Sequence, residues 1–474
     1  MKTSAETSWA RFLSRYGMLG VLAGLCVFFS VVTIQDQPAS GVSGARRLAR
    51  EIVAQSPSGA RILVVARDTA EEGEFARELS GRLQRAGFVV VGTVLGQPPE
   101  ARAALQRLAD DDHAIQIIAA SEAPANWTVL REAGTQFSSL REVQLRYPRS
   151  HRGSNFLKTE NLLNISNQIA VIAIVAVGAT FVIITGGIDL SVGSLIALSA
   201  VVGTLLIRDV AGGEQATAMG MVLCGAAAVG VCALMGGVAG ACVNFLRVPP
   251  FIVTLAMMLV ASGLAFIVSR GLSIYQVPDS FVWLGRGNTL GLPNAVLLMA
   301  LLYAAAHLMM KHTVLGRYLY AVGGNLEAAR LSGVPVPRVI AFAYLASGAL
   351  AGVGGMVMAS QLKSGSPTYG QVYELYVIAA VVVGGTSLKG GEGGVLGTLI
   401  GAFIIAVIQN GMNLTGVESY TQKVVLGLVI LGAVVLDNLK QRGWQWLRQR
   451  RAAAESNEHV PAVPATPDPQ RTIS

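Results

Sequence analysis

The sequence predicts an all-α polytopic membrane protein of about ten transmembrane helices, with a small α/β domain inserted between helices 1 and 2. Its 474 residues are 52% hydrophobic and only 14% charged, whereas soluble domains carry about 25% charged residues. The mean hydropathy is +0.54. Charged residues are dense from Arg46 to Lys158 and sparse from Asn161 to Asp437. One part of the chain therefore belongs in water and the other in lipid.

Several function classes are excluded by composition. The net charge of +8 is spread over helix ends and not over one patch, which argues against a nucleic-acid partner. The four cysteines lie in apolar runs without metal or redox spacing. The glycine-rich stretch from Gly384 to Gly394 lacks the Lys-Ser/Thr pair of a nucleotide-binding loop. We therefore expect no catalytic residues, metal or cofactor, and no ATP binding by this chain itself.

The first apolar run, Tyr16 to Thr33, follows three basic residues and is about long enough to span a bilayer. A secretory signal is the alternative, but no small-x-small cleavage site follows directly. We interpret residues 1–36 as a cytoplasmic N-terminus and a retained first helix.

Residues 37–154 show strand and helix periodicities typical of a soluble fold. Three buried strands are predicted at Arg61 to Ala66, Phe88 to Leu95 and Ala114 to Ala119. Helices at Glu72 to Arg85 and Pro99 to Leu108 separate them. This βαβαβ order predicts a small, largely parallel sheet.

The transmembrane domain is predicted at residues 155–440 as a series of apolar segments. These are Ile165 to Ile184, Leu190 to Ile207, Ala218 to Asn244, Phe251 to Ser269, Pro293 to Met310, Ile340 to Ala359, Leu375 to Ser387, Val395 to Asn413 and Val424 to Leu436. The basic short loops fall on one side, which predicts cytoplasmic termini and an extracytoplasmic insert. Residues 441–474 are expected to form a disordered cytoplasmic tail.

An internal similarity links two parts of this domain. Val171 to Thr180 (VIAIVAVGAT) resembles Val377 to Thr386 (VIAAVVVGGT), and a glycine pair follows each, at 186–187 and 390–391. Glycine-interrupted helices in corresponding places are typical of transporters with a pathway between repeats. Chance similarity between apolar segments is the alternative. Our count of helices makes the repeats parallel, and one re-entrant segment would make them inverted.

The run Gly186 to Ser194 (GGIDLSVGS) places an acid, two hydroxyls and three glycines between apolar helices. A carboxylate there costs roughly 2.5 to 3.5 kcal/mol on insertion scales, so it needs a partner or water. One interpretation is a broken helix lining a path. The other is that Asp189 caps the next helix at the positive end of its dipole. The two are compatible.

This run resembles the hallmark segment of the permease subunits of ribose, xylose and galactose ABC importers. Further motifs from about Asn155 to Arg442 carry the same resemblance, namely FLKTENLLNISNQ, NFLRVPPFIVTLAMM, GGNLEAARLSGV and YELYVIAAVVVGGTSLKGGEGGVLGT. It implies a homodimeric permease of the bacterial inner membrane that translocates a monosaccharide by alternating access. It also implies a periplasmic sugar-binding protein and a cytoplasmic ABC ATPase as partners. The path or broken-helix candidates are Gly186, Gly187, Asp189, Ser191, Ser194, Glu374 and Tyr376. Tyr376 departs from the family pattern, which usually has an aspartate there.

The segment from Gly323 to Arg338 lies on the basic side, and Leu326 to Ser332 within it is predicted to be a short helix that stops at Gly333. It resembles the coupling helix that docks into the ATPase. The candidate contacts are Asn325, Glu327, Arg330, Leu331 and Gly333. A solvated loop carrying ordinary positive-inside charge is the alternative.

The insert resembles the first lobe of a periplasmic sugar-binding protein. Ligands of such sheets bind at the carboxyl ends of the strands, which makes Arg67, Asp68 and Ser121 candidate contacts. One lobe alone has no cleft to close, so we favour docking or regulation over sugar capture, with a structural spacer as the alternative. For the whole chain, the rival functions are a membrane-anchored sensor and a secondary transporter for a small polar solute.

Overall fold

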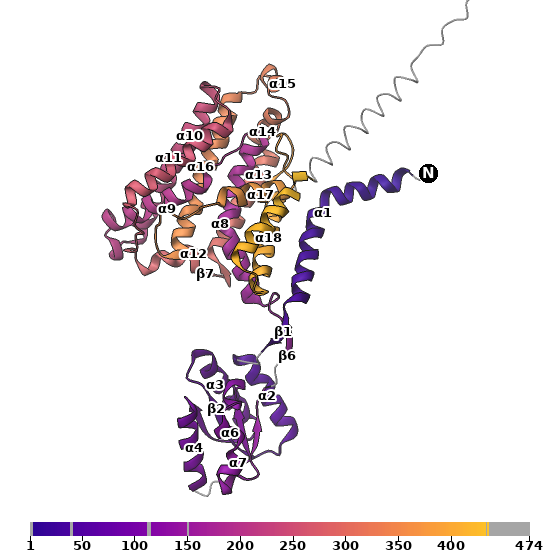
Figure 1. Cartoon of the computed structure of the whole chain (residues 1–474), viewed down its shortest axis with the longest axis vertical. Coiled ribbons are helices and arrows are strands. Elements are labelled where there is room, and N and C mark those ends of the chain that lie inside the picture. Colours follow the sequence, from indigo (N-terminus) through magenta and orange to yellow (C-terminus); the bar gives the residue numbers. More distant parts are fainter. Residues whose placement is uncertain (1–2, 38–40, 111–114, 149–150, 433, 436–474) are drawn as a thin grey trace, which may run out of the picture. The chain divides into compact units, whose positions relative to one another are not determined.

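The computed structural model describes residues 3–37, 41–110, 115–148, 151–432 and 434–435. The predicted tail at 441–474 lies outside them. The chain divides into two compact units, residues 31–155 and the remainder. We call the first the insert and the second the membrane unit. Figure 1 shows the elements of both.

The membrane unit is helical. Its longer helices are α1 (Thr3–Val32), α8 (Thr159–Ile184), α9 (Val192–Asp209), α10 (Ala218–Phe245), α11 (Pro250–Ser269), α13 (Asn294–His312), α16 (Val336–Leu362), α17 (Tyr373–Val383) and α18 (Val395–Leu414). Shorter elements are η2 (Gly213–Gln215), η3 (Asp279–Val282), α12 (Trp283–Arg286), β7 (Asn288–Thr289), β8 (Leu292–Pro293), α14 (Val314–Gly324) and α15 (Leu326–Leu331).

Seven helices among the described residues are long and apolar enough to cross a membrane, namely α8, α9, α10, α11, α13, α16 and α18. Three shorter apolar helices cover Gly17–Val32, Tyr373–Val383 and Ser419–Gly432. The chain is therefore a multi-pass membrane protein. The sequence-based number of about ten includes the three shorter helices, whose length alone does not qualify them as spans.

Two helices form the centre of the membrane unit. Every residue of α8 from Ile169 to Ile184 is buried, and α16 packs against α8, α9 and α10. Small residues allow these backbones to approach closely. A Cβ added to Gly236 on α10 would lie 2.3 Å from the carbonyl oxygen of Tyr344 on α16. By contrast, α10 and α11 leave most of their apolar surface exposed, which suits a lipid-facing position.

The insert contains a four-stranded sheet of order β3-β2-β4-β5 in which all pairs are parallel. Its strands are β2 (Arg61–Ala66), β3 (Val89–Leu95), β4 (Ile117–Ala120) and β5 (Gln144–Arg146), and its helices are α2 (Gly41–Gln55), α3 (Ala70–Arg85), α4 (Pro98–Asp110), α5 (Glu122–Ala125), α6 (Thr128–Arg131), α7 (Ala133–Gln136) and η1 (Ser138–Leu140). The third strand begins at Ile117, whereas the predicted start at Ala114 lies outside the described residues. The pattern did not predict β5, which has only three residues.

Alternation along β2 divides the core of the insert into two layers. Ile62, Val64 and Ala66 pack with α2 and α3 on one face. Leu63 and Val65 pack with α4 on the other. Because both faces are covered, β2 reads as a continuous apolar run.

A two-stranded antiparallel neck joins the ends of the insert. β1 (Ile34–Gln37) pairs with β6 (His151–Ser154), with Ile34 opposite Ser154 and Gln37 opposite His151. The hydroxyls of Thr33 and Ser154 are also 3.1 Å apart. The two ends of the insert therefore lie next to each other.

Candidate functional site

The chain breaks its helical path between α8 and α9. Gly186 has φ +83°, a left-handed conformation that an L side chain rarely adopts. Gly187 leaves room for the ring of Tyr344, since a Cβ there would lie 2.5 Å from the phenolic oxygen. The predicted break at Gly186 and Gly187 is thus present, and each glycine has a steric reason.

Asp189 is the buried polar centre of this break, with 2% of its surface exposed. One carboxyl oxygen accepts hydrogen bonds from the backbone N–H and the hydroxyl of Ser191, at 3.0 and 2.6 Å. The other accepts one from the hydroxyl of Ser347 on α16, at 2.7 Å. Within the described part of the chain, no Lys or Arg forms an ion pair with it.

This geometry refines the capping interpretation of Asp189. The N-cap of α9 is Ser191, so Asp189 lies two residues ahead of the cap. Its bond to the N–H of Ser191 closes an Asx-turn, which supports the bend before the helix. Asp189 therefore holds the turn and also fastens it to α16.

The two glycine pairs of the internal similarity meet in space. The N–H of Gly391 donates to the carbonyl of Ile184, the last residue of α8, at 2.9 Å. A Cβ on Gly390 would lie 3.0 Å from the backbone nitrogen of Gly186. α8 ends at this contact, and the loop that follows α17 reaches it from Val383. The resemblance in sequence thus corresponds to a physical junction.

Gly323, at the end of α14, joins the same junction. A Cβ on it would lie 1.7 Å from the carbonyl oxygen of Ile184 and 2.5 Å from the nitrogen of Gly391. We call Ile184, Gly186, Gly323, Gly390 and Gly391 the glycine junction. Only a glycine fits at position 323, because backbone atoms surround it.

The first turn of α17 presents its side chains in two directions. Val372, its N-cap, has φ +70°, which is unusual for a β-branched residue. Tyr373 and Tyr376 follow at i and i+3 and share a face, with ring centroids 6.1 Å apart. Glu374 points elsewhere, and its Oε2 would lie 2.2 Å from a Cβ on Gly193 of α9. The predicted candidates Glu374 and Tyr376 therefore point in different directions and have different neighbours.

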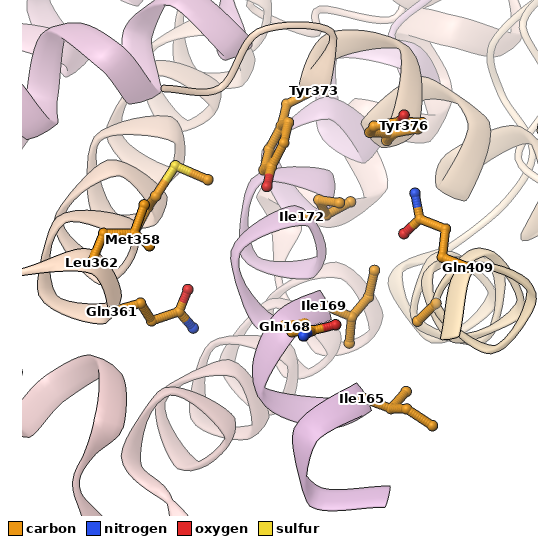
Figure 2. A pocket seen from close by; sticks show the side chains of 11 residues that line it. Ile165, Gln168, Ile169, Ile172, Met358, Gln361, Leu362, Tyr373, Tyr376 and Gln409 are labelled. Carbon is orange, nitrogen blue, oxygen red and sulfur yellow. The ribbon is translucent and has the colours of Figure 1, made fainter. Parts of the chain in front are cut away.

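Ser194 and Glu374 line one cavity of about 320 Å³, together with Ser262 of α11 and the segment around Gly370. Tyr376 lines a second cavity, of about 240 Å³, between α8, α16, α17 and α18 (Figure 2). Gln168, Gln361 and Gln409 line this second cavity as well. Sequence reasoning missed these glutamines, because periodicity alone does not say which faces of four helices converge.

The segment from Asn325 to Gly333 has the predicted short helix. The side chain of Asn325 accepts the N–H of Ala328 at 2.9 Å as the N-cap of α15. Gly333 has φ +79° after its end. Glu327 and Arg330 form an exposed ion pair at 3.1 Å, and Leu331 is 88% exposed. Figure 1 shows α15 at one end of the membrane unit, opposite α12.

Comparison with known proteins decides the family. Residues 161–434, more than half of the chain, match the family described as "Branched-chain amino acid transport system / permease component". The chain belongs to this family. Its members are transport components, so this permease is not an enzyme.

Individual relatives of the permease carry more specific names. It is 46% identical to the ribose import permease protein RbsC of Escherichia coli (strain K12) over 291 residues, which are 60% of this chain and 88% of that protein. It is 42% identical to RbsC of Bacillus subtilis (strain 168) over 296 residues, 60% and 87% of the two chains. It is 35% identical to the D-allose transport system permease protein AlsC of Escherichia coli (strain K12) over 284 residues, 60% and 85%. No solved structure matches the permease.

The insert lies outside the family match. The structure places two of its predicted ligand residues, Arg67 and Ser121, around an acid of the protein itself. The Nε of Arg67 lies 2.7 Å from the Oε1 of Glu72. The backbone N–H of Arg67 and the hydroxyl of Ser121 donate to Oε2, at 2.6 and 2.8 Å. Glu72 is 6% exposed, while Asp68 is exposed beside it. The carboxylate of Glu72 therefore uses the groups of Arg67 and Ser121 expected to contact a ligand.

The environment of Glu72 also sets its charge. Burial raises the pKa of its carboxyl, but the hydrogen bonds from Arg67 and Ser121 and the charge of Arg67 outweigh burial, and the net pKa is below its usual range. Glu72 is therefore a carboxylate at neutral pH. Among the residues the structure describes, no group of three or more His, Cys, Asp or Glu is arranged to hold a metal ion.

Proposed function

We propose that this permease is the transmembrane subunit of an ATP-driven importer that moves a monosaccharide across the bacterial inner membrane. The observation that carries the proposal is the 46% identity to a ribose import permease over 291 residues. The family match, at residues 161–434, contains the break at Asp189, the glycine junction and α15. Relatives named for D-allose and L-arabinose support the broader class of monosaccharides over one sugar.

Alternating access is the proposed mechanism, and the glycine junction supports it. Three backbone segments meet there without side chains between them, so a shift of one displaces the others. One of the three, the end of α14, leads directly into α15. When the ATPase closes and moves α15, the end of α14 would therefore move with it and displace the end of α8 and the loop after α17.

The proposed partners are a cytoplasmic ABC ATPase, a periplasmic sugar-binding protein and a second copy of the chain. The exposed Leu331 and the ion pair of Glu327 and Arg330 give α15 a mixed apolar and polar surface suited to ATPase docking. Asn325 and Gly333 cap the helix and fix its length. These five residues form the proposed coupling surface.

Orientation follows from α15. If it faces the ATPase, the ends of α8 and α17 that meet at the junction are cytoplasmic, and the start of α8 at Thr159 is extracytoplasmic. The insert, which ends just before α8, is then extracytoplasmic, and both termini are cytoplasmic. This agrees with the charge of the short loops.

The insert is proposed as an accessory domain, either a docking element for the binding protein or a spacer. Glu72 already engages Arg67 and Ser121, which disfavours sugar capture at that edge of the sheet. The insert therefore is not part of the proposed path for the sugar.

Reconstitution tests the proposal. The permease, an ABC ATPase and a binding protein encoded beside it would be placed in liposomes, and uptake of labelled D-ribose, D-allose and L-arabinose measured with and without ATP. We expect uptake of at least one sugar that requires ATP and both partners. Uptake driven by a proton or sodium gradient without the ATPase would contradict the proposal and favour a secondary transporter.

A further inference from the structure

The cavity between α8, α16, α17 and α18 has walls of two kinds (Figure 2). Ile165, Ile169, Ile172, Met358 and Ala406 form buried apolar walls. The exposed Leu362 adds a further apolar contact, and three primary amides and two phenols complete the lining, at Gln168, Gln361, Gln409, Tyr373 and Tyr376. None of the eleven lining residues is charged. The cavity thus offers hydrogen bonds and apolar contact without ionic partners.

Several of these polar groups have no partner in the protein. Within the described residues, the side chains of Gln168 and Gln409 and the hydroxyls of Tyr373 and Tyr376 make no protein hydrogen bond. The amide of Gln361 donates to the carbonyl of Asn167 at 2.9 Å, which leaves its oxygen free. Gln168 is exposed, and Gln361, Gln409, Tyr373 and Tyr376 are half-buried, so their polar atoms are accessible to water or to a ligand in the cavity.

Two of the cavity's helices, α8 and α18, also carry a pair of amides that serve helix packing. Asn161 on α8 and Asn410 on α18 donate to each other, at 2.9 and 3.0 Å. Gln409 is the neighbour of Asn410 in sequence but faces the cavity. The asparagine pair and the bond from Gln361 to Asn167 link the helices of the cavity, whereas helix packing does not account for Gln168 and Gln409.

We propose that this cavity is a monosaccharide-binding site inside each protomer. Amides both donate and accept, so the three glutamines match sugar hydroxyls, which do the same. The rings of Tyr373 and Tyr376 cover the C–H face of the sugar, and their hydroxyls add polar contacts. The volume of about 240 Å³ lies below the range of drug-sized pockets, roughly 300 to 1,000 Å³, as suits a smaller ligand.

The cavity's uncharged lining helps to choose between the two classes of transported molecule that the comparisons name, amino acids and sugars. The family description names branched-chain amino acids, and a zwitterionic amino acid would leave its ammonium and carboxylate without counter-charges in this cavity. A neutral sugar loses only hydrogen bonds to water, and the glutamines replace these. The site therefore favours an uncharged polyol, and this assignment rests on the proposed function.

The location of the cavity suits a transient binding site on the import path. The lining residues come from the start of α8 and of α17 and from the later turns of α16 and α18. The glycine junction lies at the opposite ends of α8 and α17. In the proposed orientation the cavity is in the extracytoplasmic half, where sugar arrives first.

Transport by the reconstituted importer tests the site. Gln168→Leu and Gln409→Leu would be compared with Gln276→Leu, a matched change at an exposed glutamine outside the cavity. We expect about tenfold lower D-ribose uptake below half-saturation for each cavity variant, as expected when one or two hydrogen bonds are lost. ATP hydrolysis stimulated by the binding protein should stay at the wild-type rate, which shows that the complex still assembles.

A second measurement does not depend on those variants. Gln168→Cys in the full importer would be treated with a thiol reagent, and modification at position 168 followed by mass spectrometry. D-ribose should slow the modification and L-leucine should not. Equal rates with both, or uptake by the cavity variants equal to that of Gln276→Leu, would overturn the site while leaving the importer intact. No ATP-dependent sugar uptake by the wild type would instead overturn the proposed function.

Discussion

Asp189 and Ser347 are 158 residues apart in sequence, yet the hydroxyl of Ser347 donates to the Asp189 carboxyl at 2.7 Å in the buried centre of the membrane unit. This bond ties the break between α8 and α9 to α16. Because α16 also packs against α10, the bond connects the break to most of the helical core. The polar turn is therefore anchored and not free to move alone.

Ser347→Ala should remove this anchor without changing the helix. We expect a loss of about 1 kcal/mol, since hydrogen bonds between membrane helices contribute roughly 0.6 to 2 kcal/mol. The apparent Tm in detergent should fall by a few degrees. Ser166→Ala is the control, because that hydroxyl bonds only within its own helix. An unchanged Tm for Ser347→Ala would show that the bond contributes nothing.

Gly323→Ala should disable transport, whereas Gly324→Ala should not. A Cβ at 323 collides with backbone atoms of Ile184 and Gly391, but a Cβ at 324 meets nothing within 4 Å. We expect a reduction of tenfold or more in ATP-driven uptake for the first variant, because backbone cannot move aside as a side chain does. Uptake by reconstituted vesicles measures both. Equal activity of the two variants would contradict a tightly packed junction.

The sequence predicted those parts of the fold and site that depend on local signals. Glycines that need positive φ marked the break at Gly186 and the end of α15 at Gly333, and apolar length marked the helices. Ser347 and the three glutamines were not predicted, because their roles depend on which faces of helices far apart in sequence face each other. Glu72 escaped for a related reason. A carboxylate in the first turn of a helix looks like a dipole partner until the structure shows Arg67 and Ser121 around it.

Acidification should weaken the insert through Glu72. Its folded-state pKa lies below the unfolded value of about 4.3, so the stabilisation is fully present above that value. It is lost as pH falls toward the folded-state pKa. Hydrogen exchange at the β2 and β4 amides, corrected for intrinsic rates, should therefore speed up at acid pH. Glu72→Gln should exchange faster at neutral pH and show a smaller change with pH. An identical pH response in wild type and variant would contradict this role.

Leu331→Asp should weaken binding of the ATPase. Burying a leucine side chain contributes roughly 1.5 to 3 kcal/mol, so the Kd should rise about tenfold or more. Leu290→Asp is the matched control, since Leu290 is 93% exposed on the turn between β7 and β8, away from α15. Binding of the purified ATPase to the permease in nanodiscs measures the difference. Equal affinities for the two variants would place the ATPase contact elsewhere.

Deletion of the insert should leave a working permease. Gln37 and His151 are paired partners in the neck of β1 and β6, so a short Gly-Ser turn can join them after residues 38–150 are removed. The core of the insert is separate from that of the membrane unit. We expect ATP-dependent sugar uptake within about a factor of two of the full chain when binding protein is saturating. A lower apparent affinity for the binding protein would assign the insert a docking role, and an unchanged affinity would make it a spacer. Complete loss of uptake by a chain that still binds the ATPase would show instead that the insert is essential for transport, as expected for a sensor.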